Sequence, residues 1–200
     1  HNYHDRSKSF PYGYVETTDL HRRTCWAQEI WPFIEQQPLY DLYMQDTQLW
    51  VMDVDPAVRD AQLDGFQCPS DGSQPARGAS GGSRAGAAGA QGNYVVCTGS
   101  GIMYYGTGDL GGMFYRRSDT DFADIIDGTS NTLLASEGIV RGKTTGGWGG
   151  AGGYWGGAPH GGLLGLPDRV DVGHLSASWS DSICISLAAS TDSSLPRHGS

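Results

Sequence analysis

Apolar residues in the first quarter of the chain recur at the spacing of an α-helix. Trp26, Ile30, Phe33 and Ile34 would share one face of a helix within residues 20–43. The polar positions between them would face solvent. This pattern predicts an amphipathic helical region whose apolar face packs in the core.

Prolines set the expected limits of the helices. Proline lacks an N–H and clashes with the preceding turn, so we expect Pro32 to interrupt or restart this helix and Pro38 to end or kink it. Residues 1–8 are expected to be the end of another helix. Pro56 suits the first position of a short helix capped by Asp55.

Short apolar runs bounded by turn-forming residues predict β-strands. The candidates are residues 47–53, 93–98, 112–117, 132–140 and 182–188. Because most of these strands follow the helices instead of alternating with them, we expect an α+β fold. The length of 200 residues predicts a single domain, residues 1–200.

Glycine is concentrated in two segments. Residues 72–92 contain 7 of the 31 glycines, and residues 142–165 contain 12. We expect both segments to be long surface loops that decorate an ordinary core.

The charge balance limits the classes of partner. Lys and Arg number 13 against 22 Asp and Glu, which gives a net charge of −9. Such an acidic chain is a poor binder of nucleic acid, because a phosphate backbone requires a basic surface. No run of 18 apolar residues predicts a membrane-spanning helix within the sequence.

Four cysteines lie far apart as Cys25, Cys68, Cys97 and Cys184. Zinc sites usually take their ligands in close pairs, and no such pair is present. An even number of scattered cysteines suggests an oxidising compartment and up to two disulfides, for which three connectivities exist. The alternative is four buried thiols.

An acidic cluster suggests calcium, because hard oxygen ligands suit this ion. The cluster comprises Asp119, Asp121, Asp124 and Asp127. Its spacing is not that of an EF-hand. The alternative is an acidic turn in which Asp127 and Asn131 cap their own backbone. Calcium is the one cofactor that the sequence suggests.

Other motifs carry little weight. Residues 106–111 match GxGxxG, but strand-like residues follow where a dinucleotide site needs a helix. Residues 138–144 resemble a P-loop that is one residue too short. His1 and His4 beside Asp5 suggest metal ligands, or simply exposed residues at a helix end. Without a nucleophile, base and orienting group in sequence, we expect a protein that is not an enzyme.

Trp148, Tyr154 and Trp155 lie among the glycines of the second loop. Exposed aromatic rings stack on sugar faces, so these three residues are a candidate contact surface for a glycan. The alternative is that they cover the sheet or a contact between subunits.

Several separated segments occur in the order and spacing of one known family. The main segments are residues 1–5, 26–37, 66–71, 93–95 and 112–137. Within them the motif residues are Cys68, Pro69, Ser70, Asp71, Asp127, Gly128, Thr129, Ser130 and Asn131. Over residues 1 to about 140 the chain resembles a large bacterial family of pilin-like proteins of unknown function, which has also carried a solute-binding label.

The resemblance implies a fold, a partner and a location. The fold is a pilin-like head with short helices packed on an antiparallel sheet. The partner is the protein itself, in a type IV pilus-like or pseudopilus-like helical filament outside the cell. An apolar N-terminal helix, of which residues 1–8 would be the end, would anchor the subunit in the inner membrane before assembly. The alternative is an extracellular or periplasmic protein that binds a solute or glycan.

Overall fold

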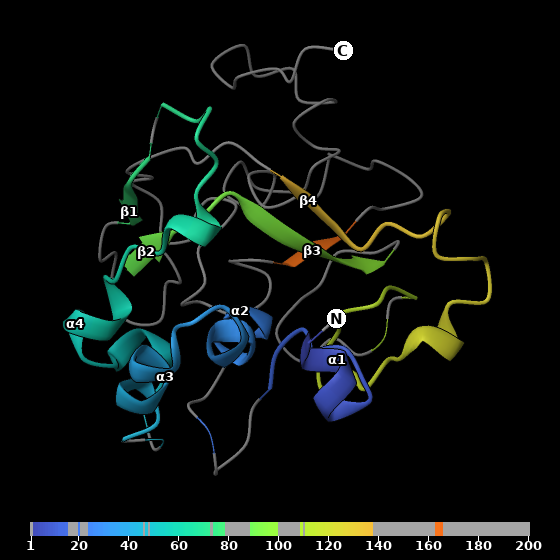
Figure 1. Cartoon of the computed structure of the whole chain (residues 1–200), viewed down its shortest axis with the longest axis horizontal. Helices are drawn as coiled ribbons and strands as arrows, with labels where there is room; N and C mark the ends of the chain where they lie inside the picture. Colours follow the sequence, from blue (N-terminus) through green and yellow to red (C-terminus); the bar gives the residue numbers. More distant parts are fainter. Residues whose placement is uncertain are drawn as a thin grey trace, which may run out of the picture.

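The computed structural model describes just over half of the chain. The described residues are 2–15, 20, 24–45, 47, 49–72, 74–78, 89–99, 109, 111–137 and 163–165. Figure 1 shows that the helices gather on one side of the strands β3 and β4. Helices and short strands thus occupy separate regions, which is compatible with the predicted α+β class.

The described helices are all short. The α-helices are α1 (Asn2–Ser7), α2 (Trp26–Ile30), α3 (Gln37–Tyr43) and α4 (Pro56–Arg59). The 3-10 helices are η1 (Trp31–Phe33), η2 (Val51–Asp53), η3 (Asp64–Phe66) and η4 (Phe122–Asp124). The helix expected near residues 1–8 is therefore confirmed as α1.

The helical region around residues 20–43 is broken as the prolines suggested, with one difference. Pro32 lies in η1, which interrupts the helix. Pro38 lies in the first turn of α3, so it begins this helix instead of ending α2. The first turn of a helix has no intrahelical partner for its N–H groups, so proline costs nothing there.

The interruption also changes which side chain enters the core. Trp31 is only 3% exposed, whereas Ile34, which was expected on the apolar face, is 37% exposed. Helical periodicity beyond Ile30 therefore predicted the wrong residue, because η1 rotates the following side chains away from the α-helical register.

The short helix α4 has the predicted cap. Oδ1 of Asp55 accepts a 2.7 Å hydrogen bond from the N–H of Ala57. The strand expected over residues 47–53 is wrong, because Val51 begins the 3-10 helix η2 and the N–H of Asp53 bonds back to the carbonyl of Trp50 at 2.8 Å. A short apolar run does not distinguish a strand from a buried turn of helix.

The main sheet has three strands in the order β4-β3-β5. The strands are β3 (Tyr94–Gly99), β4 (Ala135–Glu137) and β5 (Leu163–Gly165). β4 pairs antiparallel with β3, as expected, but β5 pairs parallel with it. The expected strand at 93–98 is confirmed, that at 132–140 is shorter where it is described, and 182–188 lies outside the described residues.

Part of the first glycine-rich segment is ordered as a hairpin. β1 (Ala76–Gly78) pairs antiparallel with β2 (Gly89–Gln91). The prediction that all of residues 72–92 form a loop is therefore wrong for the two strands. Residues 79–88, between the strands, lie outside the described residues. β5 likewise interrupts the segment 142–165.

Residues 112–117 do not form the expected strand. Separate backbone hydrogen bonds connect them to two other segments instead. The N–H of Gly13 bonds to the carbonyl of Tyr115 at 3.0 Å, and the N–H of Phe114 bonds to the carbonyl of Cys97 at 3.2 Å. The segment thus links the N-terminal residues to β3. Because Gly112 lies directly against the backbone of Thr98 and Gly99, a side chain has no room there.

A single cluster of buried side chains lies between these elements. Aromatic rings dominate it, and Trp26 meets Phe66 edge to face at 5.8 Å between ring centroids. The buried members are Tyr14, Cys25, Trp26, Ala27, Trp31, Tyr43, Val51, Val54, Val58, Phe66, Val96, Met113 and Phe114. The helices supply most of this core, and β3 contributes Val96.

Candidate functional site

The family-motif segment Cys68–Asp71 is held by hydrogen bonds with one buried asparagine. Oδ1 of Asn93 accepts hydrogen bonds from the N–H of Cys68 at 2.8 Å and from Nε2 of Gln74 at 2.7 Å. Its Nδ2 donates to Oδ2 of Asp71 at 2.6 Å. One side chain at the start of β3 thus orders both ends of the Cys68–Asp71 turn.

Glu137 on β4 contacts the same group of motif residues. Tyr94 and Glu137 are partners across the β3–β4 pair, and a hydrogen bond with Glu137 raises the pKa of Tyr94. Sγ of Cys68 lies 3.9 Å from Oε2 of Glu137. Residues that the sequence placed in three separate motif segments therefore meet at one end of the sheet, where they form a hydrogen-bonded clamp.

The second motif segment is a tight turn. Gly128 has a φ of +86°, a conformation that side chains rarely adopt. Nδ2 of Asn131 donates to the carbonyl of Asp127 at 2.9 Å, and the hydroxyl of Thr132 donates to the carbonyl of Gly128 at 3.1 Å. The motif from Asp127 to Asn131 is thus a self-capped turn, which is the alternative that the sequence left open.

The acidic cluster uses two carboxylates as helix caps. Oδ1 of Asp121 accepts from the N–H of Ala123 at 2.6 Å, and Oδ2 of Asp124 accepts from the N–H of Asp121 at 2.9 Å. Within the described part of the chain, no group of three or more His, Cys, Asp or Glu could hold a metal ion. The predicted calcium site of Asp119, Asp121, Asp124 and Asp127 is therefore not assembled there.

The described cysteines are thiols. Cys25 and Cys97 are buried, Cys68 is half-buried, and no disulfide joins any two of these three. The Cys25 thiol donates to Oε1 of Gln28 at 3.1 Å, and burial raises the pKa of Cys25 to about 12. Cys184 lies outside the described residues.

A partly buried carboxyl group, which the sequence pattern did not reveal, lies on α2 where this helix faces α1. The hydroxyl of Tyr12 donates to Oε1 of Glu29 at 2.6 Å, and the hydroxyl of Tyr3 donates to Oε2 at 3.5 Å. Burial raises the pKa of Glu29, and the two tyrosine hydrogen bonds partly offset that rise. No sequence signal marked Glu29, because it occupies an ordinary polar position of an amphipathic helix.

Aromatic contacts fix α1 to the rest of the described chain on two sides. The Tyr3 ring meets Phe33 edge to face at 5.2 Å, and the guanidinium of Arg6 lies 5.9 Å from the centre of the same Phe33 ring. On the other side, the His4 ring lies 4.6 Å from Phe122. His4 therefore packs between aromatic rings, and His1, its suggested metal partner, is outside the description.

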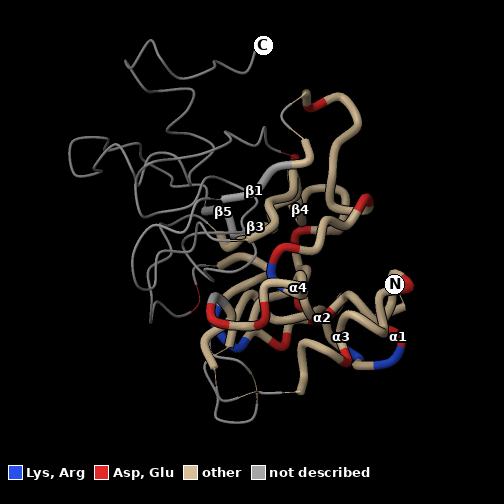
Figure 2. The backbone as a smooth tube through the Cα atoms, turned by 90° about the vertical axis from the view of Figure 1, so that its left-hand side faces the viewer, with Lys and Arg blue, Asp and Glu red and all other residues tan. Residues whose placement is uncertain are grey.

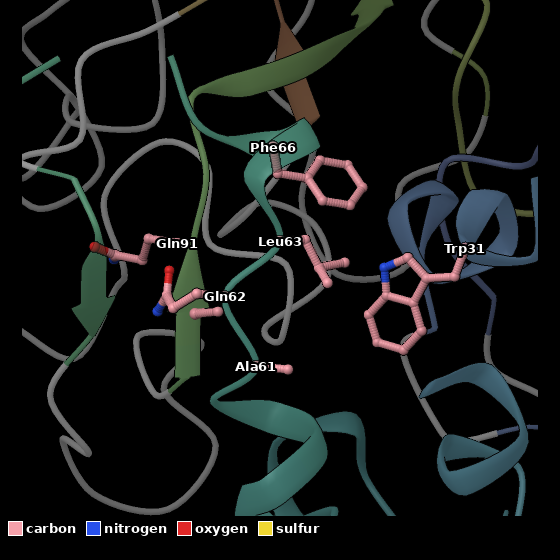
Figure 3. Close-up of a pocket in the computed structure, with 7 residues that line it drawn as sticks. Trp31, Ala61, Gln62, Leu63, Phe66 and Gln91 are labelled. Atoms are coloured by element: carbon pink, nitrogen blue, oxygen red, sulfur yellow. The ribbon is translucent and has the colours of Figure 1, made fainter. Parts of the chain in front are cut away.

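A small cavity opens between η1, the segment that follows α4 and the strand β2. Figure 3 shows its lining, with Trp31, Leu63 and Phe66 on one side and Gln91 on the other. The cavity volume is about 10 Å³, which has room for about one water molecule. Both polar atoms of the Gln91 amide are buried without a hydrogen-bond partner. This cavity is too small for a sugar or other organic solute.

Several sequence candidates lie outside the description. They are the aromatic residues Trp148, Tyr154 and Trp155 and the P-loop-like residues 138–144. Of the GxGxxG match only two residues are described, and there Oδ1 of Asp109 accepts from the N–H of Gly111 at 2.7 Å. None of the described helices is both long and apolar enough to cross a membrane.

Comparison with known families gives a match over nearly the whole length of the chain. The model of a family described as "Protein of unknown function (DUF1559)", with the label SBP_bac_10, matches residues 1–196. The chain belongs to this family. Neither the curated proteins nor the solved structures gave a significant match. The clamp around Asn93 and the turn at Gly128 are therefore features of a DUF1559 protein.

Proposed function

We propose that this DUF1559 protein is the head of a subunit in a type IV pilus-like or pseudopilus-like filament outside the cytoplasm. In this proposal the head has a pilin-like fold, performs no catalysis and assembles with copies of itself. The single observation that carries the proposal is the docking of α1 on the head.

The docking supports a filament role because it fixes the direction of α1 relative to the head. Tyr3 and Arg6 contact Phe33, while His4 contacts Phe122 in a distant part of the chain. A helix end that is bound on two sides cannot swing freely. An apolar helix that continued α1 toward the N-terminus would therefore keep a constant angle to the head, which a regular helical polymer requires.

The solute-binding alternative has weaker support. The label of the family model suggests it, but the cavity beside Trp31, in the part of the chain that the structure describes, has a volume of about 10 Å³. Ligand sites for small organic molecules usually measure about 300–1,000 Å³. A filament subunit requires no such pocket, so the cavity does not count against the filament proposal.

Electron microscopy of the natural gene product tests this proposal. The protein is purified from its own cells with whatever native residues precede His1, and is then imaged by negative stain. We expect filaments with a regular subunit repeat. A monodisperse monomer that keeps its native N-terminal residues and gains thermal stability with a glycan would overturn the proposal.

Paired variants connect the experiment to α1. Tyr3→Ala combined with His4→Ala removes contacts on both sides of the helix and should give fewer and less regular filaments. Asn2→Ala changes an exposed, uncharged residue of the same helix and is the control. Circular dichroism of each head verifies that the fold is retained.

A further inference from the structure

The segment from Asp119 to Leu134, called here the acidic lobe, exposes large apolar side chains. Ile126 is 88% exposed, and the other three are roughly two-fifths exposed. The four side chains are Phe122, Ile126, Leu133 and Leu134. Figure 1 shows the lobe, in yellow, extending beside α1. Apolar exposure that is concentrated in one short segment marks a contact surface more often than scattered single residues do.

The acidic lobe is rigidly built despite its exposure. Asp121 and Asp124 cap η4 reciprocally, and the turn that follows is closed by Asn131 on the carbonyl of Asp127. Ile126 lies between these two hydrogen-bonded units, and its own N–H bonds to the carbonyl of Asp124 at 3.0 Å. A pre-formed surface loses little conformational entropy on binding, which favours association.

The charge of the lobe limits its partners. Asp119 and Asp127 are exposed beside the apolar residues, and no Lys or Arg occurs between residues 118 and 140. Anionic lipid and nucleic acid would be repelled by this surface. A second acidic lobe would be repelled as well, which disfavours a two-fold contact between identical surfaces. The partner surface must therefore combine positive charge with apolar area.

The end of α1 combines two exposed basic side chains with apolar area, although the acidic Asp5 is exposed in the same helix (Figure 2). Arg6 and Lys8 are exposed and, among the described residues, neither forms an ion pair. Arg6 also lies over the Phe33 ring, and the exposed Ile34 follows Phe33 in the chain. The same molecule thus carries one surface of each kind. A contact between two different surfaces can continue from copy to copy, and this propagating form is the one that a filament requires.

We propose that the acidic lobe of one copy binds the α1 end of the next copy, with Ile126 as the apolar anchor and Asp119 and Asp127 facing Arg6 and Lys8. This inference rests on the proposed filament function and names the contact that propagates the filament. Within each copy, the ring contact between His4 and Phe122 joins α1 to the lobe. Successive contacts would therefore be mechanically continuous.

The test measures the critical concentration for filament assembly of the natural gene product. Ile126→Ser should raise that concentration by about tenfold or more, the loss expected when one aliphatic side chain is removed from a contact. The control is Leu42→Ser, which changes a 50% exposed leucine on α3 and should leave assembly unchanged. Circular dichroism verifies the fold of each variant.

Charge reversal tests the pairing. The double variants Asp119→Lys/Asp127→Lys and Arg6→Glu/Lys8→Glu should each assemble poorly alone. The chain that carries all four changes should assemble again, because the two surfaces regain opposite charge.

The outcomes separate the two proposals. Filaments that form normally with Ile126→Ser, or that fail to recover in the fourfold variant, would overturn this contact and leave the filament function standing. If Leu42→Ser impairs assembly as strongly as Ile126→Ser, the assignment to the lobe is also wrong. Failure of the unmodified protein to form filaments would overturn the filament function together with the contact.

Discussion

The hydroxyl of Tyr12 donates a 2.6 Å hydrogen bond to Oε1 of Glu29, a mostly buried carboxyl group at the junction of α1 and α2. Tyr3 donates to the second oxygen of the same group. The carboxyl group of Glu29 is therefore the point where the N-terminal helix, the following loop and α2 are joined.

This arrangement predicts a pH dependence. Burial raises the pKa of Glu29 in the folded state, so the folded protein binds the proton more tightly than the unfolded chain. The stability contributed by this group is complete below the unfolded pKa, near 4.5, and is lost as the pH rises through the folded pKa. Glu29→Gln cannot ionise, so its stability relative to the natural protein should increase from pH 4 to pH 8.

Urea unfolding across that pH range measures the effect. Tyr12→Phe is the companion variant, because loss of its hydrogen bond raises the pKa of Glu29 further and should steepen the pH dependence. It should also lower the free energy of unfolding by about 1 kcal/mol at neutral pH. Parallel pH profiles for Glu29→Gln and the natural protein would contradict this prediction.

The cysteines should differ in reactivity. Burial raises the pKa of Cys25 to about 12, whereas the Cys68 side chain is partly accessible. In a Cys184→Ser background at pH 8, a thiol reagent should modify Cys68 first and Cys25 only after unfolding. Peptide mass spectrometry after timed labelling assigns the sites. Equal labelling rates for Cys25 and Cys68 in the native protein would refute the expected order.

The clamp around Asn93 should contribute strongly to stability. Asn93→Ala leaves the N–H of Cys68 and the side chains of Gln74 and Asp71 without this partner, which should cost about 2–4 kcal/mol. Asn93→Asp should also destabilise, because it places a second carboxylate beside Asp71. Adding Asp71→Asn restores a donor and an acceptor, so the double variant should recover part of the loss.

A double-mutant cycle by urea unfolding measures this coupling. Additive losses from Asn93→Asp and Asp71→Asn would show that the two side chains do not interact as the structure has them. Ser70→Ala, a change within the same turn, is the control and should have a small effect.

Gln91 should be a site where the protein gains stability. The residue is 3% exposed, and both polar atoms of its amide lack a hydrogen-bond partner. Replacing a buried unsatisfied amide with an apolar side chain of similar volume removes a desolvation cost of about 1–3 kcal/mol. Gln91→Met should therefore raise the melting temperature.

Differential scanning calorimetry measures this change. Gln62→Met alters an amide that lines the same cavity and bonds to Gln67, so it should show no such gain. A lower melting temperature for Gln91→Met would indicate that a water molecule or another polar group pairs with the amide.

Gly112 should tolerate no side chain. A Cβ atom there would overlap the backbone of Thr98 and Gly99, which cannot move without disturbing β3. Gly112→Ala should destabilise the protein by about 2–3 kcal/mol. Gly72→Ala meets no neighbouring atom within 4 Å and should change stability by less than about 0.5 kcal/mol. Similar unfolding free energies for the two variants would show that the close approach at Gly112 does not exist.

Local signals in the sequence predicted local structure well. Asp55 followed by Pro56 correctly predicted a capped helix start, and the apolar run at residues 93–98 predicted β3. Both signals act within a few residues, through a side-chain cap and through β-forming side chains. The helical pattern around Trp26 was correct only until Pro32, where the backbone changed its period.

The candidate sites were harder to predict because they depend on contacts between distant residues. Cys68 meets Asn93 across 25 positions and Glu137 across 69. Spacing identified all three as parts of one family pattern but said nothing of their contact. The four aspartates near residue 120 show the converse, because closeness in sequence suggested a shared ion whereas two of them cap η4.

The sequence alone determined the family, the charge, the capped start of α4 and the strand β3, since these follow from composition and short-range chemistry. Only the tertiary structure decided that Glu29 is partly buried against two tyrosines, that Trp31 replaces Ile34 in the core, and that Ile126 remains exposed. Burial depends on which surfaces meet after the chain has folded. The identity of a single residue does not specify which surfaces will cover it, so its environment cannot be derived from its neighbours in sequence.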